Sequence, residues 1–351
     1  MTSATVTIDV GLLVVPPIGG SVEDVHGYVE RILDWAKLLD EPWIALCMSE
    51  NASGALSTDA LFPVRDRLRH LFTRHGIQEY DVNTVAAVIN RLLQHTPSFE
   101  TYYRVHDTLS EDFTTTPDVM QFCTGQGLQT DLARCILLLA ILRRHCQEDI
   151  LQNALVLRHC PERTIRVRAL VHEIEHERDG QFNDIPKPPE YFEGNVLACD
   201  DFRGLLSCID ESAVLAGAID ADGVEIAIRI RLYKSRIERN EEPQWDNAGG
   251  MIIGSHFRDA ISRCCKNADP GFPDRALRAV CSAIDQQNLR AVHALRTGPG
   301  GNDPQRRRSF DNSKAWRRDI DHEYHFHYWE LQNGSIEVAT VGVHNELSIP
   351  E

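Results

Sequence analysis

The chain has few lysines, no long hydrophobic run and no Cys-x-x-Cys pair, and the last two absences each argue against a class of protein. Only five of its 351 residues are lysine, so arginine supplies nearly all of the positive charge. The longest apolar run, from Cys135 to Leu142, is far shorter than the roughly 20 residues that a membrane span needs. The N-terminus has no basic residue ahead of an apolar core, so we expect neither a secretory signal nor a membrane partner.

The ten cysteines follow neither a disulfide nor a zinc-site spacing. None belongs to a Cys-x-x-Cys pair, and Cys47, Cys135, Cys199 and Cys281 stand in apolar surroundings, where a thiol acts as a small hydrophobe. Reduced cysteines are typical of the cytosol, so we expect a cytoplasmic protein.

The periodicity of apolar residues predicts helices in the first part of the chain. Apolar residues recur every three or four positions over 25–39, 68–72 and 85–93, which is the spacing of one buried helix face. Asp131 then begins a strongly apolar helix that continues through Leu142. We expect this last helix to be central to a core.

Strands are predicted further along, where apolar residues alternate with others. Residues 165–171 and 224–232 show this pattern. Two more such stretches, 324–331 and 336–343, flank Asn333-Gly334, a strong signal for a hairpin with a type I′ turn.

The expected fold class is α+β, with a mainly helical N-terminal domain, a mixed middle region and a small antiparallel C-terminal sheet. Polar or Pro/Gly-rich stretches at 110–116, 186–189 and 297–301 suggest the boundaries. They predict a helical domain at residues 1–110 and a helix-plus-strand region at 117–185. A mixed α/β region at 190–296 and a basic linker with a hairpin module at 297–351 follow.

His172-Glu173-Ile174-Glu175-His176 matches His-Glu-x-x-His and resembles the zincin metalloprotease signature. The resemblance implies that His172 and His176 bind Zn²⁺ from one helix face while Glu173 polarises the attacking water. Glu190 or Glu193 would supply a third ligand.

The residues before this motif favour another interpretation. Residues 164–171 read as a strand, and on a strand His172 and His176 would stand about 13 Å apart, too far for one ion. We therefore prefer a solvated charged strand that ends in a hairpin at Asp179-Gly180. A zinc peptidase remains an alternative.

Three carboxylates in the first part of the chain carry a second resemblance. Asp9, on an apolar N-terminal strand, together with Glu50 and Asp131, resembles the acidic spacing of PIN-domain nucleases. That resemblance implies carboxylates that gather Mg²⁺ for phosphodiester hydrolysis. Helix caps and surface carboxylates explain Glu50 and Asp131 equally well.

Positive charge is concentrated near the C-terminus of an acidic chain. Residues 304–318 contain five Arg and one Lys against one Asp, whereas the whole chain carries a formal charge of −16. A local basic segment with aromatic residues is typical of a part that contacts phosphate. Tyr328 is a candidate for stacking on a base, and the candidate phosphate ligands are Arg306, Arg307, Arg308, Lys314, Arg317 and Arg318.

Histidines in the same segment are candidates for acid–base chemistry. His325 and His327 alternate with Phe326 and Tyr328, so both imidazoles share one face of the predicted strand. If Phe326 packs inward, the two histidines point outward beside whatever the arginines bind. His344 is a third candidate, in a supporting or catalytic role, because histidine moves protons near neutral pH.

Two preceding helices, a basic connection and a hairpin that closes on a histidine resemble the RelE/HigB-like toxin fold over about residues 255–351. The segments that carry the resemblance are 316–320, 324–328 and 341–346. It implies a small antiparallel sheet that holds mRNA in the ribosome, where basic and aromatic residues promote attack of a 2′-hydroxyl on the adjacent phosphate. Toxins of this family are small and basic, whereas a large acidic region precedes the module here.

The leading prediction is a prokaryotic toxin- or defence-type protein whose C-terminal domain binds RNA or DNA, with cleavage as a further activity and no required cofactor. One alternative is a non-catalytic subunit of a larger complex that docks a protein partner through its acidic N-terminal domain. The other is a zinc peptidase with Zn²⁺ at His172 and His176. A purely structural sheet, with Trp316, Tyr328 and Trp329 in its core, explains the C-terminal pattern as well.

Overall fold

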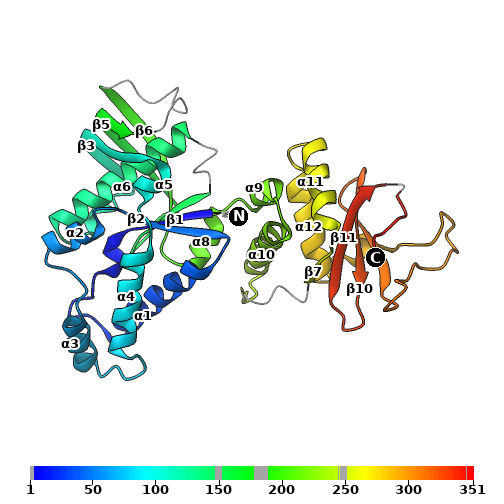
Figure 1. Cartoon of the computed structure of the whole chain (residues 1–351), viewed down its shortest axis with the longest axis horizontal. Helices are drawn as coiled ribbons and strands as arrows, with labels where there is room; N and C mark the ends of the chain where they lie inside the picture. Colours follow the sequence, from blue (N-terminus) through cyan, green and yellow to red (C-terminus); the bar gives the residue numbers. More distant parts are fainter. Residues whose placement is uncertain (1–3, 147–151, 178–188, 244, 246–250, 345) are drawn as a thin grey trace. The chain divides into compact units, whose positions relative to one another are not determined.

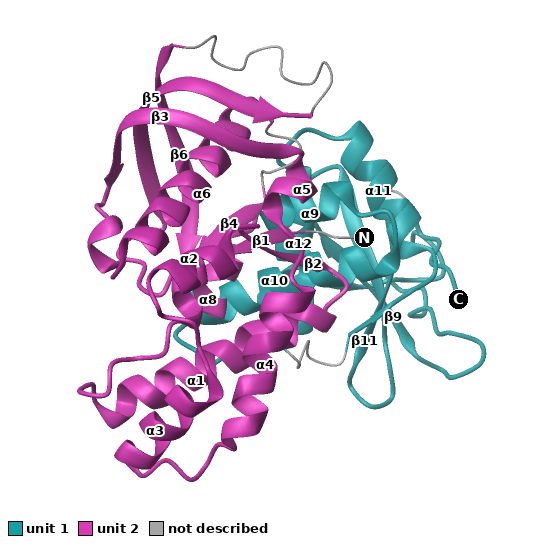
Figure 2. Cartoon of the chain, turned by 60° about the vertical axis from the view of Figure 1, so that its left-hand side comes forward, with its two compact units in different colours: residues 1, 210–351 teal, residues 2–209 magenta. Residues whose placement is uncertain are grey.

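The computed structural model describes residues 4–146, 152–177, 189–243, 245, 251–344 and 346–351 (Figure 1). The chain divides into two compact units, an N-terminal unit of residues 2–209 and a C-terminal unit of residues 210–351 (Figure 2). Each unit combines helices with a sheet, so the α+β class is confirmed. Within the described ranges, every helix is too short or too polar to cross a lipid bilayer.

The N-terminal unit is built on a six-stranded mixed sheet with strand order β2-β1-β4-β6-β5-β3. The first four strands in this order are parallel, and β5 and β3 continue the sheet as antiparallel neighbours. The strands are β1 (Ala4–Ile8), β2 (Ile44–Met48), β3 (Val105–Thr116), β4 (Asn153–Val156), β5 (Thr164–His176) and β6 (Glu190–Cys199). Because β1 pairs with β4, residues 1–110 and 117–185 share one sheet and are not separate domains.

Seven α-helices are described in this unit: α1 (Val22–Lys37), α2 (Ala52–Thr58), α3 (Arg65–His75), α4 (Val82–His95), α5 (Phe99–Tyr103), α6 (Gln126–His145) and α8 (Phe202–Cys208). The predicted helices are confirmed in α1, α3, α4 and α6. The capping box between Ser21 and Asp24 begins α1, and Gly76, with φ 67°, ends α3.

The predicted linker at 110–116 is wrong, because these residues belong to β3. The segment is polar, but its threonines are β-branched and suit a strand. Nearly every residue of β3 pairs with β5, and one face alternates with the other in burial. The predicted turn at Asp179-Gly180 and residues 186–188 of the next boundary lie outside the described residues.

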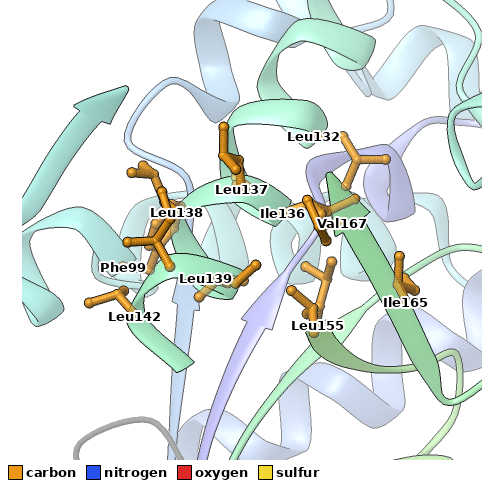
Figure 3. Close-up of a cluster of buried hydrophobic side chains, with 14 of the residues drawn as sticks. Phe99, Leu132, Ile136, Leu137, Leu138, Leu139, Leu142, Leu155, Ile165 and Val167 are labelled. Carbon is orange, nitrogen blue, oxygen red and sulfur yellow. The ribbon is translucent and has the colours of Figure 1, made fainter. Parts of the chain in front are cut away.

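Helix α6 lies at the centre of the hydrophobic core of the N-terminal unit. Its residues 135–142 are buried on every side, which explains why the apolar run is continuous rather than periodic. Figure 3 shows the packing of this helix against the sheet, with labelled side chains from α6 beside Leu155 of β4 and Ile165 and Val167 of β5. The helix thereby fixes the sheet that carries Asp9 at the end of β1.

The C-terminal unit contains helices α9 (Glu211–Gly217), α10 (Ala221–Glu238), α11 (Phe257–Asn267) and α12 (Phe272–Ile284), and a sheet of order β7-β11-β10-β9-β8. The strands are β7 (Met251–Ile253), β8 (Val292–Ala294), β9 (Lys314–Asp319), β10 (Tyr324–Glu330) and β11 (Ile336–Val343). Strands β8 to β11 form an antiparallel meander, whereas β7 pairs with β11 in parallel. The sheet is therefore mixed, and it begins before residue 297.

The predicted strand at 224–232 is wrong, because these residues lie within α10. Asp220 caps this helix by accepting a hydrogen bond from the Gly223 amide. The buried residues of the helix lie between 223 and 232 and point to several of its faces, so their sequence mimics the alternation of a strand.

The hairpin of β10 and β11 is confirmed, but its turn is not of type I′. Gln332 and Asn333 are the turn residues, because the Gly334 amide donates to the Leu331 carbonyl at 3.0 Å. Gly334 follows in the left-handed region with φ 82°. A turn followed by a left-handed glycine is the usual solution for a three-residue hairpin loop.

Candidate functional site

The sheet of the C-terminal unit has one face covered by helices and a second face that carries histidines. Phe326 of β10 packs against Phe257 of α11, with ring centroids 6.0 Å apart. Because side chains alternate along a strand, His325 and His327 lie on the opposite face, as the sequence predicts. In the register of β9 with β10, Asp319 is opposite His325 and Arg317 is opposite His327. We call this surface the histidine face.

Two rows of polar side chains cross the histidine face. In one row, His293 of β8, Arg317 of β9 and His327 of β10 are successive cross-strand partners. In the other, His325 Nε2 lies 2.9 Å from Asp319 Oδ1. His344 stands beside this pair, with its ring centroid 4.6 Å from that of His325. The face thus brings together four histidines, one arginine and one aspartate.

A groove of about 720 Å³ opens next to the histidine face. Two arginines, Arg296 and Arg317, and two histidines, His293 and His344, line it together with the glycine-rich loop at 298–301. Its described lining includes no aspartate or glutamate. The groove is therefore suited to an anionic ligand.

His325 and His327 lie on the face opposite Phe326, and His327 is paired with Arg317, but the two side chains are covered and only 2% and 0% exposed. The last residues of the chain cross this face. His327 Nδ1 lies 3.0 Å from the Ser348 carbonyl oxygen, and Trp329 Nε1 donates to the Pro350 carbonyl at 2.8 Å. Of the three predicted histidines, His344 is the exposed one that lines the groove.

Burial controls the protonation of the two covered histidines. Desolvation lowers the pKa of His327, and the carbonyl of Ser348 opposes it only in part. Desolvation likewise lowers the pKa of His325, with Asp319 acting in the opposite direction and Arg317 adding to the decrease. Both imidazoles are thus held neutral at pH 7, the form that can accept a proton.

The position of Asp319 favours one tautomer of His325. We assign the hydrogen of the neutral imidazole to Nε2, which faces the carboxylate at 2.9 Å, so Nδ1 holds the free lone pair. Nδ1 has no hydrogen-bond partner among the described residues, and neither has Nε2 of His327. A neutral imidazole oriented by a carboxylate is an arrangement that serves general bases.

Most of the predicted phosphate ligands are engaged elsewhere. Arg308 is buried between Asp311 and Glu337, at 2.6 and 2.7 Å. Lys314 lies 3.6 Å from Glu330. Burial among carboxylates neutralises much of the local positive charge that the sequence shows.

The remaining basic candidates differ in position. Arg318 is buried on the helix-covered face and donates to the Gln287 carbonyl. Arg307 is exposed and donates to the Asn312 carbonyl, and Arg306 is half-buried. Of the six predicted basic residues, only Arg317 lines the groove. Among the described residues, no carboxylate forms an ion pair with it.

Tyr328 does not lie on the histidine face. It points toward the helix-covered side, where its ring stacks on Phe326 with centroids 5.1 Å apart and is largely buried. It is thus unable to stack on a base in the groove, although its edge lines a separate pocket on the other side of the sheet.

The zinc site predicted from the zincin resemblance is not formed. His172 and His176 lie on β5, not on a helix, so the two imidazoles cannot share one ion. His172 Nε2 is 3.5 Å from Glu111, and Glu193 forms an ion pair with Arg168. Across the described residues of both units, no group of three histidine, cysteine, aspartate or glutamate side chains is placed to hold a metal ion.

The carboxylates with the PIN-like spacing meet at the end of the parallel strands, but a cation of the protein compensates them. Ser49 Oγ donates to Asp131 at 2.6 Å, and Arg134 lies 3.6 Å from Asp131 and 3.9 Å from Glu50. Burial raises the pKa of Asp9 to about 7, and the charge of Asp131 adds to this. One cation therefore offsets part of the negative charge of this cluster and occupies its centre.

Sequence reasoning missed His293, Arg296 and Asp319. Asp319 stands two positions after Arg317, so the strand period alone would have placed both on one face. His293 interrupts a short apolar stretch that is too brief to read as a strand. Arg296 and the glycine loop join the groove only through tertiary structure.

The comparisons with known proteins add no name to this arrangement. The sequence matches no family model, no curated protein and no solved structure.

Lowering the pH below about 6.5 is expected to destabilise the C-terminal sheet. An unfolded histidine has a pKa near 6.5, whereas folding lowers the pKa of His325 and His327. Below pH 6.5 the unfolded chain therefore takes up protons that the folded chain does not, and the free energy of unfolding falls. Thermal unfolding followed by circular dichroism at pH 7.5, 6.5 and 5.5 measures this effect.

The matched variants are His327→Gln, which removes a covered imidazole, and His95→Gln, which removes an exposed one. His327→Gln should flatten the decrease in Tm between pH 7.5 and 5.5, and His95→Gln should not. Parallel pH profiles for the wild-type protein and His327→Gln would contradict the assignment.

Proposed function

We propose that the C-terminal unit binds RNA or DNA through backbone phosphates in the groove beside the histidine face, in a cytoplasmic protein of toxin or defence type. One observation carries the proposal. Arg317 lines a groove without carboxylates and, among the described residues, has no carboxylate partner of its own. Guanidinium is the side-chain group best suited to hold a phosphate through two hydrogen bonds.

The surroundings of Arg317 support this assignment. Arg296, His293 and His344 add cationic or proton-donating groups, and the loop at 298–301 lets a ligand backbone approach closely because three of its residues are glycine. The net charge of −16 opposes non-specific binding elsewhere, so contact with nucleic acid would be confined to this groove.

Cleavage of RNA is the chemistry that the histidines would add. His344 reaches the groove and contacts His325, which Asp319 orients. A neutral histidine can accept the proton of a 2′-hydroxyl while that oxygen forms a bond to phosphorus. The bond from phosphorus to the 5′-oxygen then breaks, the departing oxygen takes a proton from a protonated histidine or water, and Arg317 can stabilise the negative charge that develops on the phosphate. DNA lacks the 2′-hydroxyl, so this chemistry would act on RNA alone.

The test compares Arg317→Ala with Arg307→Ala, a matched removal of an exposed arginine outside the groove. Binding of fluorescein-labelled single-stranded RNA and DNA is measured by anisotropy over a series of salt concentrations. Arg317→Ala should weaken binding about tenfold or more and reduce the salt slope by about 1, since one phosphate contact is lost. Arg307→Ala should bind nearly as the wild-type protein does.

Unchanged affinity in Arg317→Ala, or an equal loss in both variants, would refute the groove as the binding site. Gel analysis of the same RNA and DNA strands after incubation reports cleavage separately. Cut RNA beside intact DNA would support the role of the histidines.

A further inference from the structure

A second pocket lies on the other side of the sheet, between the sheet and the end of α12. It has a volume of about 380 Å³, within the usual range for small-molecule sites. Trp316, Arg318, Tyr328 and Glu330 line it, with Ile336 and Gln286 at its border. These side chains project from the helix-covered face, so the pocket is distinct from the groove beside the histidine face.

Arg318 is the feature of this pocket that calls for a ligand. The residue is only 3% exposed, and burial lowers the pKa of its guanidinium. Nη1 donates to the Gln287 carbonyl at 2.8 Å, but no carboxylate of the described residues forms an ion pair with Arg318. A buried guanidinium without an anionic partner is unfavourable unless its other N–H groups find acceptors. Arg318 lines an open pocket in which a ligand could supply such acceptors.

Glu330 supplies acceptor capacity on the same wall. Trp316 Nε1 donates to Glu330 Oε2 at 2.8 Å, and Lys314 approaches the same oxygen at 3.6 Å. Among the described residues, none donates a hydrogen bond to Oε1 of Glu330, so this oxygen can accept one from a ligand. The hydrogen bond also fixes the indole of Trp316, and stacking on Phe326 fixes Tyr328. The pocket thus offers rigid aromatic walls with a donor group and an acceptor group.

We propose that this pocket binds a guanine base. Guanine presents two acceptors, O6 and N7, which is the pattern that a guanidinium recognises in bidentate fashion. Its N1–H and 2-amino groups are donors, which suits a carboxylate such as Glu330. Adenine carries an amino group where guanine has O6, so it would place a donor against Arg318. The aromatic walls favour a planar ring system, as base-binding proteins show.

The inference does not depend on the phosphate groove, because guanosine without phosphate is the probe. Isothermal titration calorimetry of the full chain compares guanosine, inosine and adenosine. Guanosine should bind, inosine should bind about tenfold more weakly because it lacks the 2-amino group, and adenosine should show no binding at the same concentrations.

Glu330→Gln tests the acceptor, with Glu323→Gln as a matched control on an exposed residue of the same unit. Glutamine keeps a carbonyl oxygen for Trp316 Nε1, so the pocket should retain its shape. In Glu330→Gln the preference for guanosine over inosine should disappear, whereas Glu323→Gln should keep it. Arg318→Lys, checked for folding by circular dichroism, should lose guanosine binding.

Equal binding of guanosine and adenosine, no binding of guanosine at millimolar concentration, or an unchanged preference in Glu330→Gln would overturn the proposal. Arg317→Ala separates the two sites. If Arg317→Ala loses RNA binding but binds guanosine normally, both proposals are supported. If the wild-type protein binds RNA but not guanosine, only the guanine-pocket proposal is refuted.

Discussion

An Arg134→Met variant is expected to lose about 3–5 kcal/mol of stability, because it leaves buried carboxylates without a cation. The guanidinium of Arg134, on α6, lies 2.5 Å from Glu100 and 3.6 Å from Asp131. It also donates to Ser49 Oγ and to the His106 carbonyl, each at 2.8 Å. Glu100 and Asp131 are 0% and 2% exposed, so water cannot replace the lost contacts.

Urea unfolding followed by tryptophan fluorescence measures this loss. The control is Arg69→Met, which breaks an exposed pair with Asp66 and should change stability by no more than about 1 kcal/mol. Adding Glu100→Gln to Arg134→Met should restore part of the stability, because the neutral amide has a smaller desolvation penalty than a carboxylate. Similar midpoints for Arg134→Met and Arg69→Met would show that this cluster is not held by its cation.

Local sequence patterns predicted the elements whose burial is one-sided. Helices α1 and α4 each bury one face, so their apolar spacing identifies them, and in the structure Ser21 and Asp81 cap their N-termini. Helix α10 buries several faces and was taken for a strand. The parallel pairing of β1 with β4 was also beyond prediction, since Thr5 and Asn153 meet only after the intervening chain has folded.

The candidate site shows the same division between local and distant effects. The period of a strand correctly placed His325 and His327 on one face. The burial of His327 involves the backbone carbonyl of Ser348, a contact that no side-chain pattern in the sequence predicts. The cluster of arginines in the sequence overstated the positive charge of the surface for a similar reason. Asp311 and Glu337 neutralise Arg308, and Glu337 lies on β11, distant from Arg308 in the sequence.

An Asp9→Asn variant is expected to be more stable than the wild-type protein at pH 8. Burial raises the pKa of Asp9 from 3.8 to about 7. Above pH 3.8 the unfolded chain releases the Asp9 proton that the folded chain still keeps, so the free energy of unfolding falls as the pH rises. This decrease is complete once the pH has passed the folded pKa. At pH 8 the wild-type protein thus holds a buried, charged carboxylate. The resulting loss of folding stability has an upper limit of about 4 kcal/mol. Asparagine has nearly the same shape and no charge.

The pH dependence of the gain distinguishes charge from packing. At pH 8, Tm should rise by about 2–4 °C for each kcal/mol recovered. The rise should shrink to a small remainder near pH 4, where the folded carboxyl is neutral and the unfolded one, with a pKa of 3.8, is only partly ionised. Asp34→Asn, at an exposed position, is the control and should show no such dependence. A loss of Tm at both pH values would mean that Asp9 makes a contact that an amide cannot reproduce. A gain of equal size at both would place its origin in packing, because the pH-dependent difference between the wild-type protein and Asp9→Asn comes from the charge of Asp9, including its repulsion by Asp131.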